Sequence, residues 1–185
     1  MVKIFRRKRL VSSDLIKSYA VRFVENARKL KKLGFNTVDI VDLYYCSHIK
    51  RALVFYHPLP GETLRTILRN KGHNDHLVEL FVQLLAHMHE KGVFFRSCHF
   101  NNIIVANSMD SLGLIDISDM KIWPHRLSGS QRRRNLKHLA RYEIDRKSIS
   151  AFGIENFVDV YCKFCQLSES HKNKLIDILR RSIFE

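Results

Sequence analysis

The feature that most constrains the fold is a strongly apolar segment at residues 77–91, LVELFVQLLAHMHEK. Its apolar side chains recur at helical spacing over a wide face, and Gly92 follows as a stop signal. A helix of this kind is buried on most sides, so other elements must pack around it. Apolar runs at 103–105 and 112–115, separated by the turn-like residues 107–111, are typical of a β-hairpin. The sequence therefore predicts an α+β chain.

The rest of the chain divides into short elements around this helix. Residues 57–61, His-Pro-Leu-Pro-Gly, form a connector because two prolines and a glycine break regular structure. From residue 128 onward the pattern predicts helices to the end, with a basic first half. The remaining predicted strands lie at 2–5, 38–43 and 52–56, and the remaining predicted helices at 14–33 and 62–69.

Composition excludes several classes of protein. Hydrophobic residues make up 45% of the 185 residues, which is too many for a disordered chain. No apolar run approaches the roughly 18–20 residues that span a bilayer. The basic residues near the start are not followed by the apolar core of a signal peptide. We therefore expect a cytoplasmic protein.

Two of the four cysteines, Cys162 and Cys165, form a CxxC with His171 nearby. This could begin a zinc site, but a second ligand pair at the usual spacing is absent from the sequence. The same segment has the pattern of an amphipathic helix, and free cysteines are commonly buried. We expect buried structural thiols and no metal there.

The formal net charge of +14 predicts a polyanionic partner, which can be nucleic acid, an anionic membrane surface or a phosphorylated substrate. Basic residues concentrate at 6–9, 28–32 and 132–141. No aromatic residues alternate with them, and no zinc-finger, RNP or basic-zipper pattern occurs. No sequence-specific recognition of nucleic acid is expected, and a basic nucleic-acid-binding module remains an alternative based on charge alone.

The hairpin predicts a possible metal site. It places Asn102, at the start of its first strand, near Asp116, which follows its second strand. An amide oxygen and a carboxylate brought together suit Mg²⁺ carrying nucleotide phosphates, because Mg²⁺ binds few protein oxygens. In phosphoryl transfer such a metal neutralises the charge that develops between the phosphates. Asn102 and Asp116 are therefore the predicted metal ligands.

The segments FRSCHFNNIIV and LGLIDIS together resemble the catalytic loop and metal-binding segment of protein-kinase-like folds. The kinase pattern is H-R-D-x-x-x-x-N followed by an Asp, and Arg96, Asn102 and Asp116 stand at matching places. The likeness covers about residues 2–142.

The text around these motifs resembles the lipopolysaccharide core kinase family of Gram-negative bacteria, whose short relatives are called toluene tolerance proteins. The segments that carry this resemblance are YHPLPGETLR, HEKGV and RRRNLKHLARY. Those kinases use ATP to phosphorylate heptose or Kdo sugars of the inner core, on the cytoplasmic side of the membrane.

The resemblance implies a protein-kinase-like fold with a truncated N-terminal lobe and a mainly helical C-terminal lobe. Residues 1–56 would form the reduced lobe and 57–61 a hinge-like connector. Residues 62–185 would form the helical lobe, with the catalytic-loop-like segment at 94–105 and the metal segment at 112–119.

The resemblance also implies a site for ATP and Mg²⁺. Lys3 would hold the α- and β-phosphates, and Glu25 in the following helix would be its ion-pair partner. Tyr56 and His57 would belong to the hinge whose backbone holds adenine.

Two departures from the kinase pattern concern the catalytic loop. Phe95 and Ser97 replace the His and Asp of H-R-D. A neutral serine cannot act as the base that accepts the proton of the substrate hydroxyl, and loss of a general base costs about 10²–10⁴-fold in rate. The imidazole of His99, two positions further on, is an alternative proton acceptor.

Other departures lie outside that loop. D-F-G has become D-I-S at 116–118, which keeps the carboxylate, and Asp119 is close enough to assist it. Only two residues precede Lys3, so the Gly-rich strand pair that covers the phosphates has no room.

Two functions remain open at this point. The first is an ATP-dependent kinase acting on a lipopolysaccharide core sugar. The second is a pseudokinase that binds nucleotide or a partner without transferring phosphate. An anionic membrane attracts basic segments at about 1 kcal/mol per charge, so a peripheral location at the inner face of the inner membrane is also expected.

Overall fold

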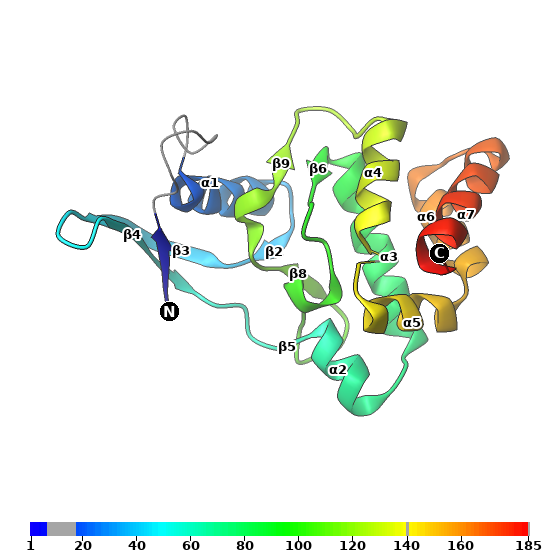
Figure 1. Cartoon of the computed structure of the whole chain (residues 1–185), viewed down its shortest axis with the longest axis horizontal. Coiled ribbons are helices and arrows are strands. Elements are labelled where there is room, and N and C mark those ends of the chain that lie inside the picture. Colours follow the sequence, from blue (N-terminus) through cyan, green and yellow to red (C-terminus); the bar gives the residue numbers. More distant parts are fainter. Residues whose placement is uncertain (7–17, 140, 185) are drawn as a thin grey trace.

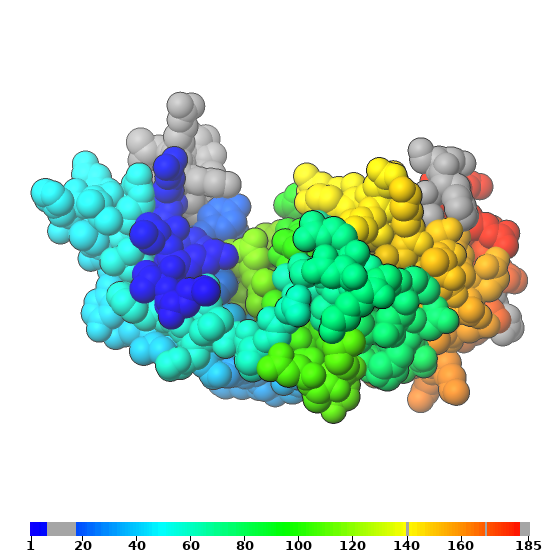
Figure 2. All heavy atoms as spheres, turned by 90° about the horizontal axis from the view of Figure 1, so that it is seen from below, coloured from blue at the N-terminus to red at the C-terminus, as the bar shows by residue number. Residues whose placement is uncertain are grey.

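The computed structural model describes residues 1–6, 18–139 and 141–184, which form an α+β structure. Figure 1 shows an antiparallel sheet with helix α1 at one end and a group of helices at the other. In the space-filling view of Figure 2, β1 (dark blue) lies on the surface near one end, and the C-terminal helices (orange to red) occupy the opposite end.

The first sheet has the order β1-β4-β3, with both pairs antiparallel. Helix α1 covers it with the buried side chains of Phe23, Ala27 and Leu30. Its N-cap is Ser18, whose Oγ accepts a hydrogen bond from the backbone N–H of Val21. The predicted strands are confirmed, whereas the predicted helix start at residue 14 lies outside the described residues. The bounds are Val2–Arg6 for β1, Tyr19–Lys32 for α1, Asp39–Cys46 for β3 and Arg51–His57 for β4.

The second sheet has the order β2-β8-β7-β5 and contains the predicted hairpin, which is confirmed as β7 and β8. The helix predicted at 62–69 begins two residues late, because Glu62 and Thr63 form a strand. Thr63 is extended and its side chain accepts from Thr66 N, so it caps α2 instead of joining it. The bounds are Asn36–Thr37 for β2, Glu62–Thr63 for β5, Leu64–Lys71 for α2, Ile103–Val105 for β7 and Leu112–Leu114 for β8.

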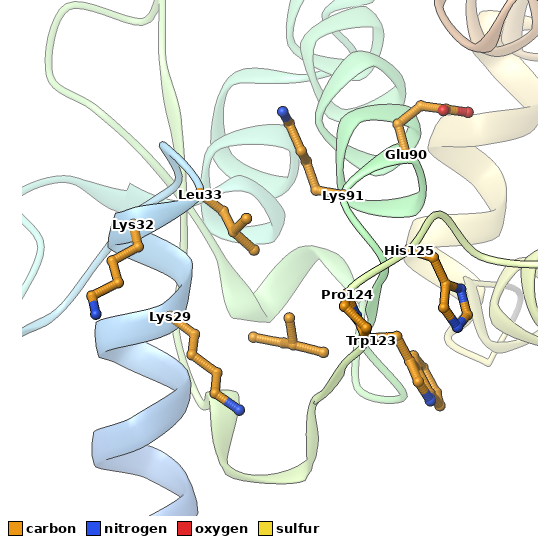
Figure 3. Close-up of a pocket in the computed structure, with 9 residues that line it drawn as sticks. Lys29, Lys32, Leu33, Glu90, Lys91, Trp123, Pro124 and His125 are labelled. Atoms are coloured by element: carbon orange, nitrogen blue, oxygen red, sulfur yellow. The ribbon is translucent and has the colours of Figure 1, made fainter.

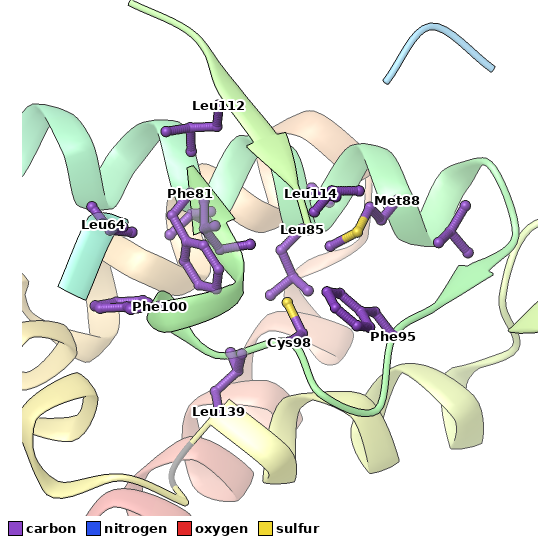
Figure 4. Close-up of a cluster of buried hydrophobic side chains, with 14 of the residues drawn as sticks. Leu64, Phe81, Leu85, Met88, Phe95, Cys98, Phe100, Leu112, Leu114 and Leu139 are labelled. Carbon is purple, nitrogen blue, oxygen red and sulfur yellow. The ribbon is translucent and has the colours of Figure 1, made fainter. Parts of the chain in front are cut away.

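The helical end is built around α3, which contains most of the apolar segment at residues 77–91. Phe81, Leu85 and Met88 of this helix are fully buried. Figure 4 shows Phe95 and Phe100 of the following loop lying among them, and the rings of Phe81 and Phe100 meet edge-on at 4.8 Å between centroids. The predicted helical C-terminal region is confirmed. The bounds are Asp75–Glu90 for α3, Gly129–Leu139 for α4, Glu143–Phe152 for α5, Ile154–Cys165 for α6 and Glu169–Phe184 for α7.

Short elements join the two ends of the molecule. The strands β6 (Val93–Phe94) and β9 (Lys121–Ile122) pair with each other. The short helices η2 (Phe100–Asn102) and η3 (Ile117–Asp119) flank the hairpin, and η3 packs against α1. The N-terminal helix therefore contacts the segment that follows the predicted metal ligand.

The predicted burial of the CxxC thiols is confirmed, since Cys162 and Cys165 lie on the inner face of α6 as free, buried cysteines. Burial raises the pKa of Cys165 to about 11. Among the helices of the described residues, none combines the length and apolar character needed to cross a membrane.

Gly92, which ends the turn after α3, provides a test of the packing between α3 and the segment before α4. An added Cβ at Gly92 would lie 2.3 Å from the carbonyl oxygen of His125 and 2.5 Å from that of Trp123. Gly34 has a similar left-handed φ, +85°, compared with +74° at Gly92. No atom lies within 4 Å of a Cβ added at Gly34.

We predict that Gly34→Ala lowers the free energy of unfolding by about 1 kcal/mol, the usual cost of a left-handed side-chain residue. Gly92→Ala should lower it by about 3 kcal/mol, because backbone atoms must also move. Urea denaturation of both variants measures the difference. Equal losses would contradict the close approach at Gly92.

Candidate functional site

The ion pair between Lys3 and Asp116 brings two predicted site residues together. The Nζ of Lys3 lies 2.6 Å from Oδ1 of Asp116, although 113 residues separate them in sequence. Lys3 also lies over the rings of Phe5 and Phe23, at 5.6 and 5.1 Å from their centroids, a cation–π arrangement that favours a fixed ammonium position. The side chains of Lys3 and Asp116 are 33% and 55% exposed, so both can be reached from solvent.

The backbone at Asp116 is held in an unusual conformation. Asp116 has φ 52° and ψ 45°, the left-handed region that non-glycine residues rarely adopt. The buried amide of Asn26 on α1 fixes the next turn, donating from Nδ2 to the carbonyl oxygens of Ile117 at 2.7 Å and Met120 at 3.3 Å. Left-handed side-chain residues cost about 1–3 kcal/mol and gather at functional sites. Helix α1 therefore holds the turn that follows Asp116.

Asn102 lies beside this segment, as the hairpin predicted. Its carbonyl oxygen accepts from the N–H of Ile115 at 3.0 Å. Its side-chain Nδ2 donates to the carbonyl oxygen of Ser97 at 3.0 Å. That bond turns the amide so that, among the described residues, no donor contacts its Oδ1.

The donor set fits Mg²⁺ better than a metal bound entirely by the protein. Within the ranges that the structure describes, no group of three or more His, Cys, Asp or Glu side chains is arranged to hold a metal. One amide oxygen, from Asn102, and one carboxylate, from Asp116, would be a small oxygen set of the kind that Mg²⁺ accepts when phosphates and water complete its shell.

The loop between Phe95 and Asn102 is fixed by two buried polar side chains from later helices. Asn135 on α4 donates to the carbonyl oxygen of Phe95 at 2.7 Å and accepts from its N–H at 3.3 Å. Asp145 on α5 accepts from the N–H of Phe100 at 3.0 Å.

Arg65 completes the second of these anchors. Its Nε and Nη2 donate to the two carboxylate oxygens of Asp145 at 2.9 and 2.8 Å. Asp145 is 1% exposed, so its charge depends on these partners. Sequence reasoning missed Asn135, Asp145 and Arg65, since only the folded chain brings them to the loop.

At the position of the kinase base, Ser97 is paired with a carboxylate. Its Oγ donates to Oδ2 of Asp119 at 2.7 Å. Burial raises the pKa of Asp119 and the charge of Asp116 adds to this, while the Ser97 hydrogen bond and Arg96 oppose it. The other oxygen of Asp119, Oδ1, is buried without a hydrogen-bond partner in the described structure.

His99 faces its own scaffold. Its Nε2 lies 3.3 Å from Nδ2 of Asn102, and its ring packs edge-on to Tyr142 at 4.8 Å between centroids. Burial lowers the pKa of His99, and Arg65 adds to the effect, which favours the neutral imidazole near pH 7. Arg96, the other predicted site residue of this loop, is exposed to solvent.

Backbone groups of the residues predicted to hold adenine already make hydrogen bonds or strand pairings within the protein. The N–H of Tyr56 donates to the carbonyl oxygen of Met1 at 3.0 Å, and the N-terminal amine of Met1 donates to the carbonyl oxygen of Tyr56 at 2.9 Å. His57 pairs with Asp39 at the end of β4. The Tyr56 hydroxyl donates to Sδ of Met1 at 2.8 Å. Burial raises the pKa of Tyr56, and the charge of Asp116 adds to this.

Glu25, the predicted partner of Lys3, lies half-buried on α1. The ion pair that Lys3 makes in the structure is with Asp116. The predicted contact between Lys3 and Glu25 stays a prediction.

A hollow of about 470 Å³ lies away from these residues (Figure 3), lined in part by Lys29, Lys32, Lys91 and Trp123. The three lysines stand at the C-terminal ends of α1 and α3, where positive charge offsets the partial negative charge of the last carbonyls. Their position has a structural explanation, and none of the predicted site residues lines this hollow.

The two anchors of the loop give a matched stability test on α5. Asp145→Ala would leave Arg65 and the N–H of Phe100 without their partner in a buried place, which typically costs about 3–5 kcal/mol. Glu143→Ala removes a pair with Lys147 in which both side chains are more than two-thirds exposed, and we expect a much smaller loss, because exposed ion pairs contribute little to stability. Chemical denaturation measures both. Similar losses for the two variants would show that Asp145 does not anchor the loop.

No protein-family model matches this chain, and no curated protein matches it.

Proposed function

We propose that this protein is a kinase-like phosphotransferase that binds ATP with Mg²⁺ and phosphorylates a sugar hydroxyl of the lipopolysaccharide inner core. The observation that carries the proposal is the 2.6 Å ion pair between Lys3 and Asp116. It forms beside Asn102, whose side-chain oxygen has no donor among the described residues. In this proposal the ammonium of Lys3 would bind phosphate, and oxygens of Asn102 and Asp116, on the two sides of one hairpin, would bind Mg²⁺.

The arrangement of elements supports a protein-kinase-like fold as the finer description. A small antiparallel sheet and helix α1 precede the connector at 57–61, and the helical part follows it. In this proposal residues 1–56 are the reduced N-terminal lobe and 62–185 the C-terminal lobe. The hairpin carries the loop on one side and Asp116 on the other.

Each residue has a role that follows from its contacts. The ammonium of Lys3, held over two aromatic rings, would bind phosphate oxygens. Asn102 Oδ1 and the Asp116 carboxylate would hold Mg²⁺, which when bound neutralises charge that develops between the phosphates. Asn26 keeps the turn after Asp116 in place.

The connector limits how adenine is held. Met1 occupies both backbone groups of Tyr56, and proline residues 58 and 60 have no N–H to donate. We therefore expect Leu59 or Gly61, in place of Tyr56, to offer the backbone N–H that recognises the base.

A second hollow, of about 330 Å³, supports an anionic, amphipathic acceptor. Arg126, Arg133 and Lys174 stand around it. Apolar side chains also line it, namely Leu127, Leu167, Leu175 and Ile178. Together with the net charge of +14, this favours a substrate that carries phosphate and lipid, reached at the inner face of the inner membrane.

A pseudokinase remains the second candidate, and Ser97 is the observation that favours it. A serine at the base position is compatible with a protein that binds nucleotide or a partner and transfers no phosphate.

Titration calorimetry with ATP tests the binding step that both candidates share. We predict that wild-type protein binds ATP only with Mg²⁺, and that Asp116→Ala and Lys3→Met each weaken binding at least about tenfold, because each removes a phosphate or metal contact. Asp110→Ala, on the exposed turn of the same hairpin, is the control and should bind normally. Absence of heat and of a thermal shift with wild type would contradict the proposed function.

A further inference from the structure

The hydrogen bond between Ser97 and Asp119 joins the loop to the turn after Asp116. Ser97 Oγ donates to Asp119 Oδ2 at 2.7 Å. The carbonyl oxygen of Ser97 also accepts from Asn102 Nδ2, and Asp119 is the last residue of η3, which begins just after Asp116. The pair is therefore tied to both proposed metal ligands through one hydrogen bond and one short helix.

The position of Asp119 is fixed by groups around it. Asn26 binds the carbonyl oxygens on either side of it, those of Ile117 and Met120. The charged or titratable groups that act on it or respond to it are Arg96, Cys98, Asp116 and His138.

One carboxylate oxygen of Asp119 is left without a partner inside the protein. Oδ1 is buried and, within the described residues, makes no hydrogen bond. An unsatisfied buried acceptor destabilises the folded protein, and such a group is typically kept where it has a function. Burial also raises the pKa of Asp119, which makes this carboxylate a stronger base than an exposed one.

We propose that Asp119, acting through the hydroxyl of Ser97, is the final proton acceptor of this site. This inference rests on the proposed phosphotransfer function. It explains how a loop with serine at the base position can still remove a proton from the attacking hydroxyl. The carboxylate comes from η3 instead of from the loop itself.

The step balances as a relay. The acceptor hydroxyl donates to Ser97 Oγ, while the Ser97 hydroxyl donates to Asp119 Oδ2. As the acceptor oxygen bonds to the γ-phosphorus, the bond from that phosphorus to the bridging oxygen of ADP breaks, and ADP leaves with the electron pair. The acceptor's proton moves to Ser97, the proton of Ser97 moves to Asp119, and Asp119 later releases a proton to water.

The alternative is that the hydrogen bond between Ser97 and Asp119 is purely structural. The variant Asp119→Asn distinguishes this structural role from the proton-accepting role. The amide oxygen of asparagine can still accept from Ser97 but cannot take a proton. A structural role predicts nearly normal turnover in this variant, whereas a proton-accepting role predicts loss of turnover with nucleotide binding kept.

The experiment measures Mg²⁺-dependent ATP hydrolysis, in which water replaces the acceptor hydroxyl, together with ATP affinity by calorimetry and thermal unfolding. We expect Asp119→Asn to lower kcat by about 10²–10⁴-fold while the Kd for ATP with Mg²⁺ stays within about twofold. Ser97→Ala should lose a similar factor, and the double variant Ser97→Ala/Asp119→Asn little more, since the two groups act as a unit. Asp110→Asn on the exposed turn is the control.

A rescue variant gives a further test of the proton-accepting role. Ser97→Asp combined with Asp119→Asn returns a carboxylate to the loop, and we expect it to recover at least about tenfold of the lost rate. Wild-type turnover in Asp119→Asn, or no recovery on rescue, would overturn the inference. If Asp119→Asn does not fold, Ser97→Ala decides instead, and normal hydrolysis there overturns the relay.

The same data distinguish failure of the relay from failure of the proposed function. Wild-type protein that binds ATP with Mg²⁺ but hydrolyses none overturns the relay and favours the pseudokinase. If the wild-type protein binds no ATP, both the proposed function and the relay are contradicted.

Discussion

The structure depends on satisfying the polar backbone of a loop that enters the core. Phe95 and Phe100 are buried among the side chains of α3, and their backbone groups must find partners there. Asn135 and Asp145 supply them from α4 and α5. Because the anchors are buried and come from two helices, the exposed part of the loop between them is held in one shape. That shape holds Ser97 and Asn102 beside the turn that carries Asp116 and Asp119.

Helix α1 has a comparable role on the other side of the site. Its apolar face covers the first sheet, which carries Lys3. Its Asn26 binds the turn that follows Asp116. Helix α1 therefore contacts both the sheet whose strand β1 carries Lys3 and the turn that follows Asp116. Both partners of the ion pair are thus held by elements that pack against the same helix.

Local patterns predicted a large part of this arrangement. Helical spacing predicted α3, and the turn between two apolar runs predicted the β7–β8 hairpin. The hairpin in turn predicted that Asn102 and Asp116 lie close together, since pairing in a short hairpin is set by neighbours in sequence. The sequence pattern predicts Thr63 inside a helix, whereas the structure has it as the cap of α2, because its side chain accepts from the backbone N–H of Thr66.

The rest depends on contacts that no local pattern records. Asn135 and Asp145 lie 40 and 45 residues from the backbone groups they bind, and polar residues on a helix normally face solvent. The partner of Ser97 is likewise decided by tertiary packing. Asp119 was noted only for its closeness to Asp116 in sequence, whereas the structure turns it toward the loop.

The separation of 113 residues between Lys3 and Asp116 also bears on the order of folding. The hairpin and α3 form through contacts between near neighbours in the chain, whereas β1 must close a much longer loop, at a greater entropic cost. The ion pair of Lys3 with Asp116 therefore needs both the first sheet and the hairpin to be in place, so partly folded protein can carry the core of the helical end and still lack this contact.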